Sequence, residues 1–141
     1  MKRILFILVS LGLGILAACA ANIPHLLPWP QKVTWTGEKF HAREISVSCA
    51  WNKNFPGMEW LSDCGISVVE SPGNRRLTIN LVNSIPGIPV NPDEAYKLRV
   101  TSNEIRIEAT TETGVYRAVQ TLRQLTEKKG KGISVAGCEI V

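Results

Sequence analysis

Two adjacent carboxylic acids, Asp93 and Glu94, are the residues of this sequence best suited to general acid–base chemistry. A carboxyl group acts as a general acid near neutral pH only where a pocket raises its pKa. The pair follows Asn91-Pro92 and precedes a strand-like segment that begins near Tyr96. A loop that leads into a strand supplies no such pocket. The sequence therefore predicts a solvated acidic loop here, and no catalytic residue.

Histidines and cysteines give little support to metal or thiol chemistry. His25 and His41 are isolated, and no two cysteines have C-x-x-C spacing, so we expect no metal and no cofactor site. Three cysteines follow the N-terminal leader described below: Cys49, Cys64 and Cys138. In an exported chain Cys49 and Cys64 are the obvious disulfide pair. The odd count argues against a disulfide framework, so buried or incidental thiols are the simpler interpretation and both remain open.

The four tryptophans divide into two groups. Trp35 and Trp51 alternate with aliphatic residues, as side chains on the inner face of a strand do, so we expect them in the core. Trp29 and Trp60 are less constrained by their neighbours. Because an exposed indole can stack on a sugar ring, these two are our candidates for a weak glycan contact.

The N-terminus has the layout of a secretory signal. A positive start is followed by an apolar run that is too short for a membrane-spanning helix, and the run ends in Leu16-Ala17-Ala18-Cys19. This tetrapeptide resembles the bacterial lipobox, which implies cleavage before Cys19 and lipidation of its sulfur. Residues 1–18 would then be a signal peptide and 19–27 a tether, and the protein would be anchored in the bacterial envelope, in the outer membrane or periplasm. An ordinary signal peptide and an uncleaved anchor are the alternatives.

Length and charge limit the function classes. The sequence has 141 residues, enough for one domain after such a leader and too few for two. Its formal net charge is +4, and the leader contributes two of these positive charges. No basic run lies elsewhere, so we expect no binding of nucleic acid.

Hydrophobic periodicity predicts the order of the elements. Period-two alternation favours strands over residues 32–37, 44–51, 66–70, 75–82, 95–101, 104–109 and 133–141. Residues 56–65 suit a short helix, residues 83–92 a proline-rich loop, and residues 114–125 a long amphipathic helix that lysines and glycines end. Ser102-Asn103 suits a hairpin turn, and we expect the charged outer faces of its two strands to pair with each other. The predicted class is α+β: one mainly antiparallel β-sheet with about two helices packed on one face.

Three stretches resemble a known domain. The more detailed match is carried by LPWPQKVTWTGEKF (27–40) and DEAYKLRVTSNEIRIEATTETGVYRAVQTLRQL (93–125), which resemble the N-terminal non-catalytic domain of bacterial β-N-acetylhexosaminidases, glycoside hydrolase family 20. The last stretch is ISVAGCEIV (133–141), which falls where members of the family continue into a catalytic barrel. The positions that match the pattern are Glu94, Ala95, Tyr96, Leu98, Val100, Ile105, Ile107, Ala109, Gly114, Tyr116, Gln120, Thr121, Leu122, Gln124 and Leu125. The resemblance implies that residues 28–141 form this domain. The segment before Cys64 is shorter than in the family, so we expect its first helix to be stunted.

The resemblance also implies a function. Family members hydrolyse terminal N-acetyl-β-hexosamine residues by a substrate-assisted mechanism, with an aspartate–glutamate pair in a (β/α)8 barrel. Asp93-Glu94 is the same dipeptide, but it lies where the N-terminal domain itself commonly has an acidic residue. We therefore expect an accessory domain that is inactive alone, lacks the barrel, and in the parent family has that barrel as its partner in cis. The alternative is a stand-alone envelope lipoprotein that binds glycans or a protein.

Overall fold

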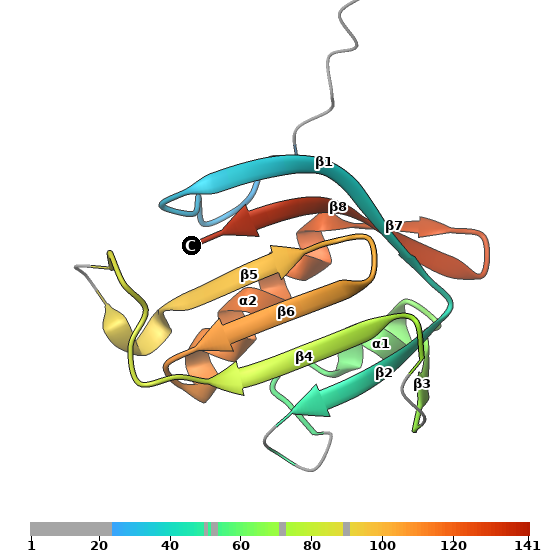
Figure 1. Cartoon of the computed structure of the whole chain (residues 1–141), viewed down its shortest axis with the longest axis horizontal. Helices are drawn as coiled ribbons and strands as arrows, with labels where there is room; N and C mark the ends of the chain where they lie inside the picture. The colour runs from blue at the N-terminus through green and yellow to red at the C-terminus, as the bar shows by residue number, and fades with distance from the viewer. Residues whose placement is uncertain (1–23, 50, 52–53, 71–72, 89–90) are drawn as a thin grey trace, which may run out of the picture.

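Alternating apolar residues form one β-sheet with a helical layer behind it (Figure 1). The computed structural model describes residues 24–141 except 50, 52–53, 71–72 and 89–90. In this part of the chain the strands are β1 (Val33–Ala42), β2 (Glu44–Cys49), β3 (Ser67–Val69), β4 (Arg76–Leu81), β5 (Tyr96–Val100), β6 (Glu104–Ala109), β7 (Thr126–Lys129) and β8 (Gly132–Ile140). The helices are α1 (Glu59–Asp63), α2 (Glu112–Leu125) and the 3-10 turn η1 (Pro92–Glu94).

The sheet has the strand order β1-β8-β5-β6-β4-β2-β3, and β7 pairs with β8 at its side. The pairs β1–β8, β5–β8, β5–β6 and β7–β8 are antiparallel. The pairs β4–β6, β2–β4 and β2–β3 are parallel. The predicted α+β class, a mainly antiparallel sheet with helices on one face, is confirmed. The parallel strip from β6 to β3 is a feature that the sequence did not indicate.

The central hairpin follows its sequence pattern. Val100 pairs with Ile105 across the predicted Ser102-Asn103 turn, and Leu98 pairs with Ile107. These four apolar side chains are fully buried on the helix side of the sheet. They pack under α2, whose buried positions are Gly114, Val115, Ala118, Val119, Thr121, Leu122 and Leu125. The helix therefore closes the core along one apolar stripe, as its 3.6-residue period predicts.

Helix α2 begins with a side-chain cap and a close backbone approach. The Thr111 hydroxyl accepts a hydrogen bond from the Gly114 N–H at 3.2 Å, which satisfies one of the unpaired donors of the first turn. A Cβ atom at Gly114 would lie 2.5 Å from the Ala95 carbonyl oxygen and 3.1 Å from the Ala109 Cβ. Only glycine lets the first turn of the helix lie this close to β5 and β6.

Several boundaries differ from the sequence-based ones. Residues 126–129 form β7, although the lysines there suggested a helix end. The strand expected over residues 32–37 is part of the ten-residue β1, which is irregular where the register shifts between Trp35 and Lys39. Helix α1 has five residues, so the expected stunted helix is confirmed. No helix in the described ranges is long and apolar enough to cross a membrane.

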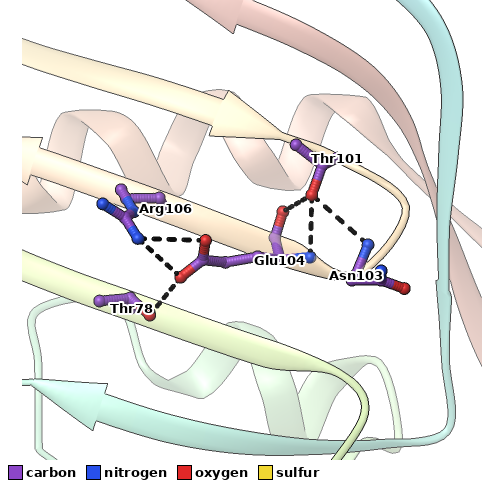
Figure 2. A network of polar contacts seen from close by, with 5 residues as sticks. All are labelled: Thr78, Thr101, Asn103, Glu104 and Arg106. Atoms are coloured by element: carbon purple, nitrogen blue, oxygen red, sulfur yellow. Dashed lines mark hydrogen bonds and ion pairs between the residues drawn. The ribbon is translucent and has the colours of Figure 1, made fainter.

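The open face of the sheet carries a network of polar side chains, shown in Figure 2. The Thr78 hydroxyl donates to Glu104 Oε1 at 2.8 Å, and Arg106 Nη2 lies 3.2 Å from Glu104 Oε2. Partial burial acts to raise the pKa of Glu104. The hydrogen bonds from Thr78 and Arg106, together with the charges of Arg106 and Arg76, outweigh it, so the pKa lies below its ordinary value.

The charge pairs differ from those expected across the hairpin. Lys97 Nζ pairs with Glu139 Oε1 of β8 at 2.8 Å, and this bond holds the pKa of Glu139 below its usual value. Arg99 lies directly opposite Arg106 in the register. In the described structure the ion pairs of the hairpin's outer side chains therefore run along β6 and from β5 to β8.

Substitution of Gly114 by alanine should destabilise the protein. Alanine in a helix is ordinarily favourable by about 1 kcal/mol, but here its Cβ would overlap the Ala95 carbonyl oxygen. We expect Gly114→Ala to lower the free energy of unfolding by about 2 kcal/mol in urea denaturation. Thr113→Ala, at an exposed position of the same turn, is the control and should change it by less than about 0.5 kcal/mol. A Gly114→Ala protein as stable as the wild type would contradict the close approach.

Candidate functional site

A groove lies on the helix side of the molecule. It lies along the outer face of α2 and has a volume of about 580 Å³. Its lining includes Gln120 and Tyr116 of α2, the side chains of Leu27 and Trp29, and Val141 after β8. We call residues 26–31 the strap, since this segment forms one wall of the groove.

The groove gathers exposed apolar side chains. Leu27 is 76% exposed, Trp29 66% and Tyr116 45%. These are three of the five large hydrophobic side chains that are exposed in the described part of the chain. Exposed apolar residues scattered singly are ordinary on protein surfaces, but a cluster in a concavity is typical of a binding or docking surface.

The charges beside the groove compensate each other. Arg117 Nη2 lies 3.2 Å from Glu94 Oε1, and both side chains are about half exposed. Deeper in the groove the Tyr96 and Thr121 hydroxyls lie 2.7 Å apart in a hydrogen bond. Burial raises the pKa of Tyr96 above its ordinary value, so this phenol stays neutral at physiological pH. The groove thus presents apolar rings and neutral polar groups, which suit an uncharged partner surface.

The strap packs against the folded domain. Leu26 is only 1% exposed. The backbone of Leu27 forms two hydrogen bonds with the Gln124 side chain of α2, each 2.8 Å long. The ordered domain therefore begins before Pro28. Cys19 and the remainder of the leader lie outside the described residues.

The acidic pair is exposed, as the sequence predicts. Asp93 and Glu94 lie on η1, which the Thr110 and Thr111 hydroxyls fasten by donating to the backbone oxygens of Pro92 and Asp93. The Glu94 carboxylate is engaged with Arg117 at the groove. The loop is therefore held through its backbone oxygens, and the Glu94 carboxylate balances the charge of Arg117.

The tryptophans separate clearly in the structure. Trp60 is 1% exposed, so its proposed role as a glycan platform is wrong: helix α1 turns it into the core. Trp29 is exposed and lines the groove. Trp35 and Trp51 are half-buried against the core, and the Trp51 indole donates to Glu112 Oε1 at 3.0 Å.

The three described cysteines, Cys49, Cys64 and Cys138, are free thiols. Cys138 lies on β8 within the core, and burial raises its pKa to about 12. Desolvation also raises the pKa of Cys64. Within the described residues no cluster of three or more histidine, cysteine or acidic side chains is arranged to hold a metal ion.

Sequence reasoning missed the feature that shapes the groove. Nothing in the sequence marked Leu27 and Tyr116 as surface residues or Gln124 as a partner of the strap. Arg75 likewise donates to the His41 carbonyl at 2.7 Å and to Asn103 Oδ1 at 2.8 Å, which no local pattern indicated. The side chains of Gln124 and Arg75 each join segments that are far apart in the sequence, so no local pattern could reveal these contacts.

Comparison with solved structures shows the same fold in several carbohydrate-active enzymes. The Vibrio harveyi GH20 exo β-N-acetylglucosaminidase matches 85% of this chain with a TM-score of 0.60 and 23% identity. CpGH84B matches 84% with a TM-score of 0.64 and 21% identity. The β-N-acetylhexosaminidase from Bacteroides fragilis matches 82% with a TM-score of 0.58 and 19% identity. This chain spans only 19%, 22% and 24% of those chains, respectively.

Sequence comparison identifies the family. No curated protein gives a significant match to the sequence. The family model described as glycosyl hydrolase family 20, domain 2, matches residues 23–141, a range that includes the strap and every strand and helix described above. The chain therefore belongs to glycosyl hydrolase family 20, through that family's domain 2.

Proposed function

We propose that this chain is the accessory, non-catalytic domain of a β-N-acetylhexosaminidase-like protein, and that its helix-side groove docks against a catalytic barrel. The single observation that carries the proposal is the cluster of Leu27, Trp29 and Tyr116 in a groove that also contains Val141. A barrel that followed Val141 would start beside this surface. Family 20 domain 2 normally shares its chain with such a barrel.

The parent activity is part of the same proposal. Barrels of this family remove terminal non-reducing N-acetyl-β-hexosamine residues, with the substrate's own acetamido oxygen as nucleophile. On this chain the acidic side chains that could mimic the catalytic pair, Asp93 and Glu94, are both exposed, and the Glu94 carboxylate pairs with Arg117 at the groove. The role of the domain is therefore to support its neighbour and not to bind the scissile bond.

The 141-residue protein should not hydrolyse an aryl N-acetyl-β-glucosaminide. Exposed carboxyls lack the desolvated pocket that a general acid needs. The release of the aryl group, followed by absorbance, should equal that of buffer. Turnover above buffer that disappears in Asp93→Ala or Glu94→Ala would contradict the accessory role.

Photocrosslinking in cells of the source organism tests the docking surface. A benzoylphenylalanine at position 116 of the gene product, expressed from its own locus, should crosslink to peptides of a family 20 barrel, in the same chain or another. The matched control is position 80, since Asn80 is exposed on the opposite face of the sheet. We expect at least a fivefold higher yield at position 116.

Other outcomes of the crosslinking would replace this proposal. A crosslink at position 116 only to a second copy of this domain would indicate self-association. If position 116 captures no barrel, and N-acetylglucosamine oligomers change the tryptophan fluorescence saturably, the groove is a glycan site. The exposure of Trp29 is the observation that favours this second function.

We also propose that the protein is a lipoprotein of the bacterial envelope, anchored through Cys19 in the outer membrane or periplasm. The motif Leu16-Ala17-Ala18-Cys19 supports this proposal. The Cys19→Ser protein should lose the mass of the lipid and move from the membrane fraction to the soluble one. Cys49→Ser is the control and should keep both properties. A Cys19→Ser protein that stays lipidated would overturn the anchor.

A further inference from the structure

A side-chain amide on α2 binds the strap as a neighbouring strand would. The Leu27 N–H donates to Gln124 Oε1 at 2.8 Å, and Gln124 Nε2 donates to the Leu27 carbonyl at 2.8 Å. Both backbone polar groups of one residue, Leu27, are thus satisfied by the oxygen and nitrogen of one side-chain amide. The two residues are 97 positions apart in the sequence, so this pairing fixes the strap to the helix directly.

The strap is held on both sides of its exposed side chains. Leu26 is buried in the core on one side. On the other, Lys32 and Val141 exchange two backbone hydrogen bonds, at 3.1 and 3.0 Å. Between these points the backbone is fixed by Gln124 while the side chains of Leu27 and Trp29 point away from the core into solvent. A fixed backbone with exposed apolar side chains is a preorganised contact surface.

We propose that the strap presents Leu27 and Trp29 as the anchors of the docking surface, and that Gln124 is the positioning residue that holds them there. The inference rests on the proposed function, and the partner to which it commits is the family 20 barrel. An uncharged, apolar face on that partner fits the groove, because Arg117 is already paired with Glu94. The adjacent Val141 places any following segment at the same surface.

Preorganisation explains why such a clamp matters for docking. An exposed tryptophan on a mobile segment must lose conformational freedom when it is buried in an interface, and this cost weakens association. Gln124 lowers this entropic cost, because its hydrogen bonds already fix the backbone of the strap in the unbound protein. A variant that frees the strap should therefore weaken docking without altering the core.

Hydrogen exchange measures the clamp independently of any partner. Gln124→Met keeps the length of the side chain and removes both hydrogen bonds. We expect amide exchange in residues 26–31 to accelerate at least tenfold, while peptides of β5, β6 and β8 keep the wild-type rate. Gln120→Met is the matched control: Gln120 lies one turn earlier on the groove, and within the described structure its side chain makes no hydrogen bond to the strap.

The yield of the crosslink at position 116 then measures how each substitution affects docking. We expect Gln124→Met to reduce its yield at least fivefold, and Gln120→Met to reduce it by less than twofold. If exchange in the strap changes by less than twofold in Gln124→Met, the positioning role is wrong even where the wild-type crosslink forms. If the wild-type protein captures no barrel while exchange still accelerates, the docking function fails and the strap's use in docking fails with it.

Discussion

The pairing of β8, one strand in from the edge of the sheet, is the constraint on which the rest of the structure depends. β8 lies between β1 and β5 and also pairs with β7, so the last strand of the sequence joins the first to the central hairpin. Its inward residues Val135, Cys138 and Ile140 are fully buried. Because β1 and β8 are antiparallel, Lys32 and Val141 meet and exchange two hydrogen bonds. The strap and the carboxyl end of the domain are therefore neighbours at the groove for a topological reason.

This topology gives the two faces of the sheet different tasks. The open face compensates its own charges through Lys97–Glu139 and the network around Glu104 (Figure 2). The Glu38 carboxylate also accepts a hydrogen bond from the Ser102 N–H at 2.7 Å, and this bond ties β1 to the hairpin turn. The helix face instead keeps apolar side chains exposed beside α2. A cluster of exposed apolar side chains such as Leu27 and Trp29 is typical of a contact surface.

Local patterns account for the parts of the fold that the sequence predicted. The period-two alternation of β5 and β6 and the 3.6-residue period of α2 are both visible within one short segment of sequence. The positions of these elements were therefore predictable. The parallel pairs around β4 join strands that are distant in sequence, and no local signal specifies them. β7 was missed because Lys128, Lys129 and the glycines after them also suit a helix end, and only pairing with β8 decides between the two. The contacts of Gln124 and Arg75 could not be predicted for the same reason, because the partners of both side chains are distant in sequence.

The acidic pair shows how the structure changes the meaning of a residue. In sequence, Asp93-Glu94 was the one feature with the composition of a catalytic site. In the structure the Glu94 carboxylate lies 3.2 Å from Arg117 at the groove, and this pairing leaves the groove without an uncompensated guanidinium. An unpaired arginine beside Trp29 and Tyr116 would penalise an apolar partner, because its charge would have to be desolvated on docking. The Glu94–Arg117 pair thus balances the charge at the groove, which suits the apolar partner that we propose for this surface.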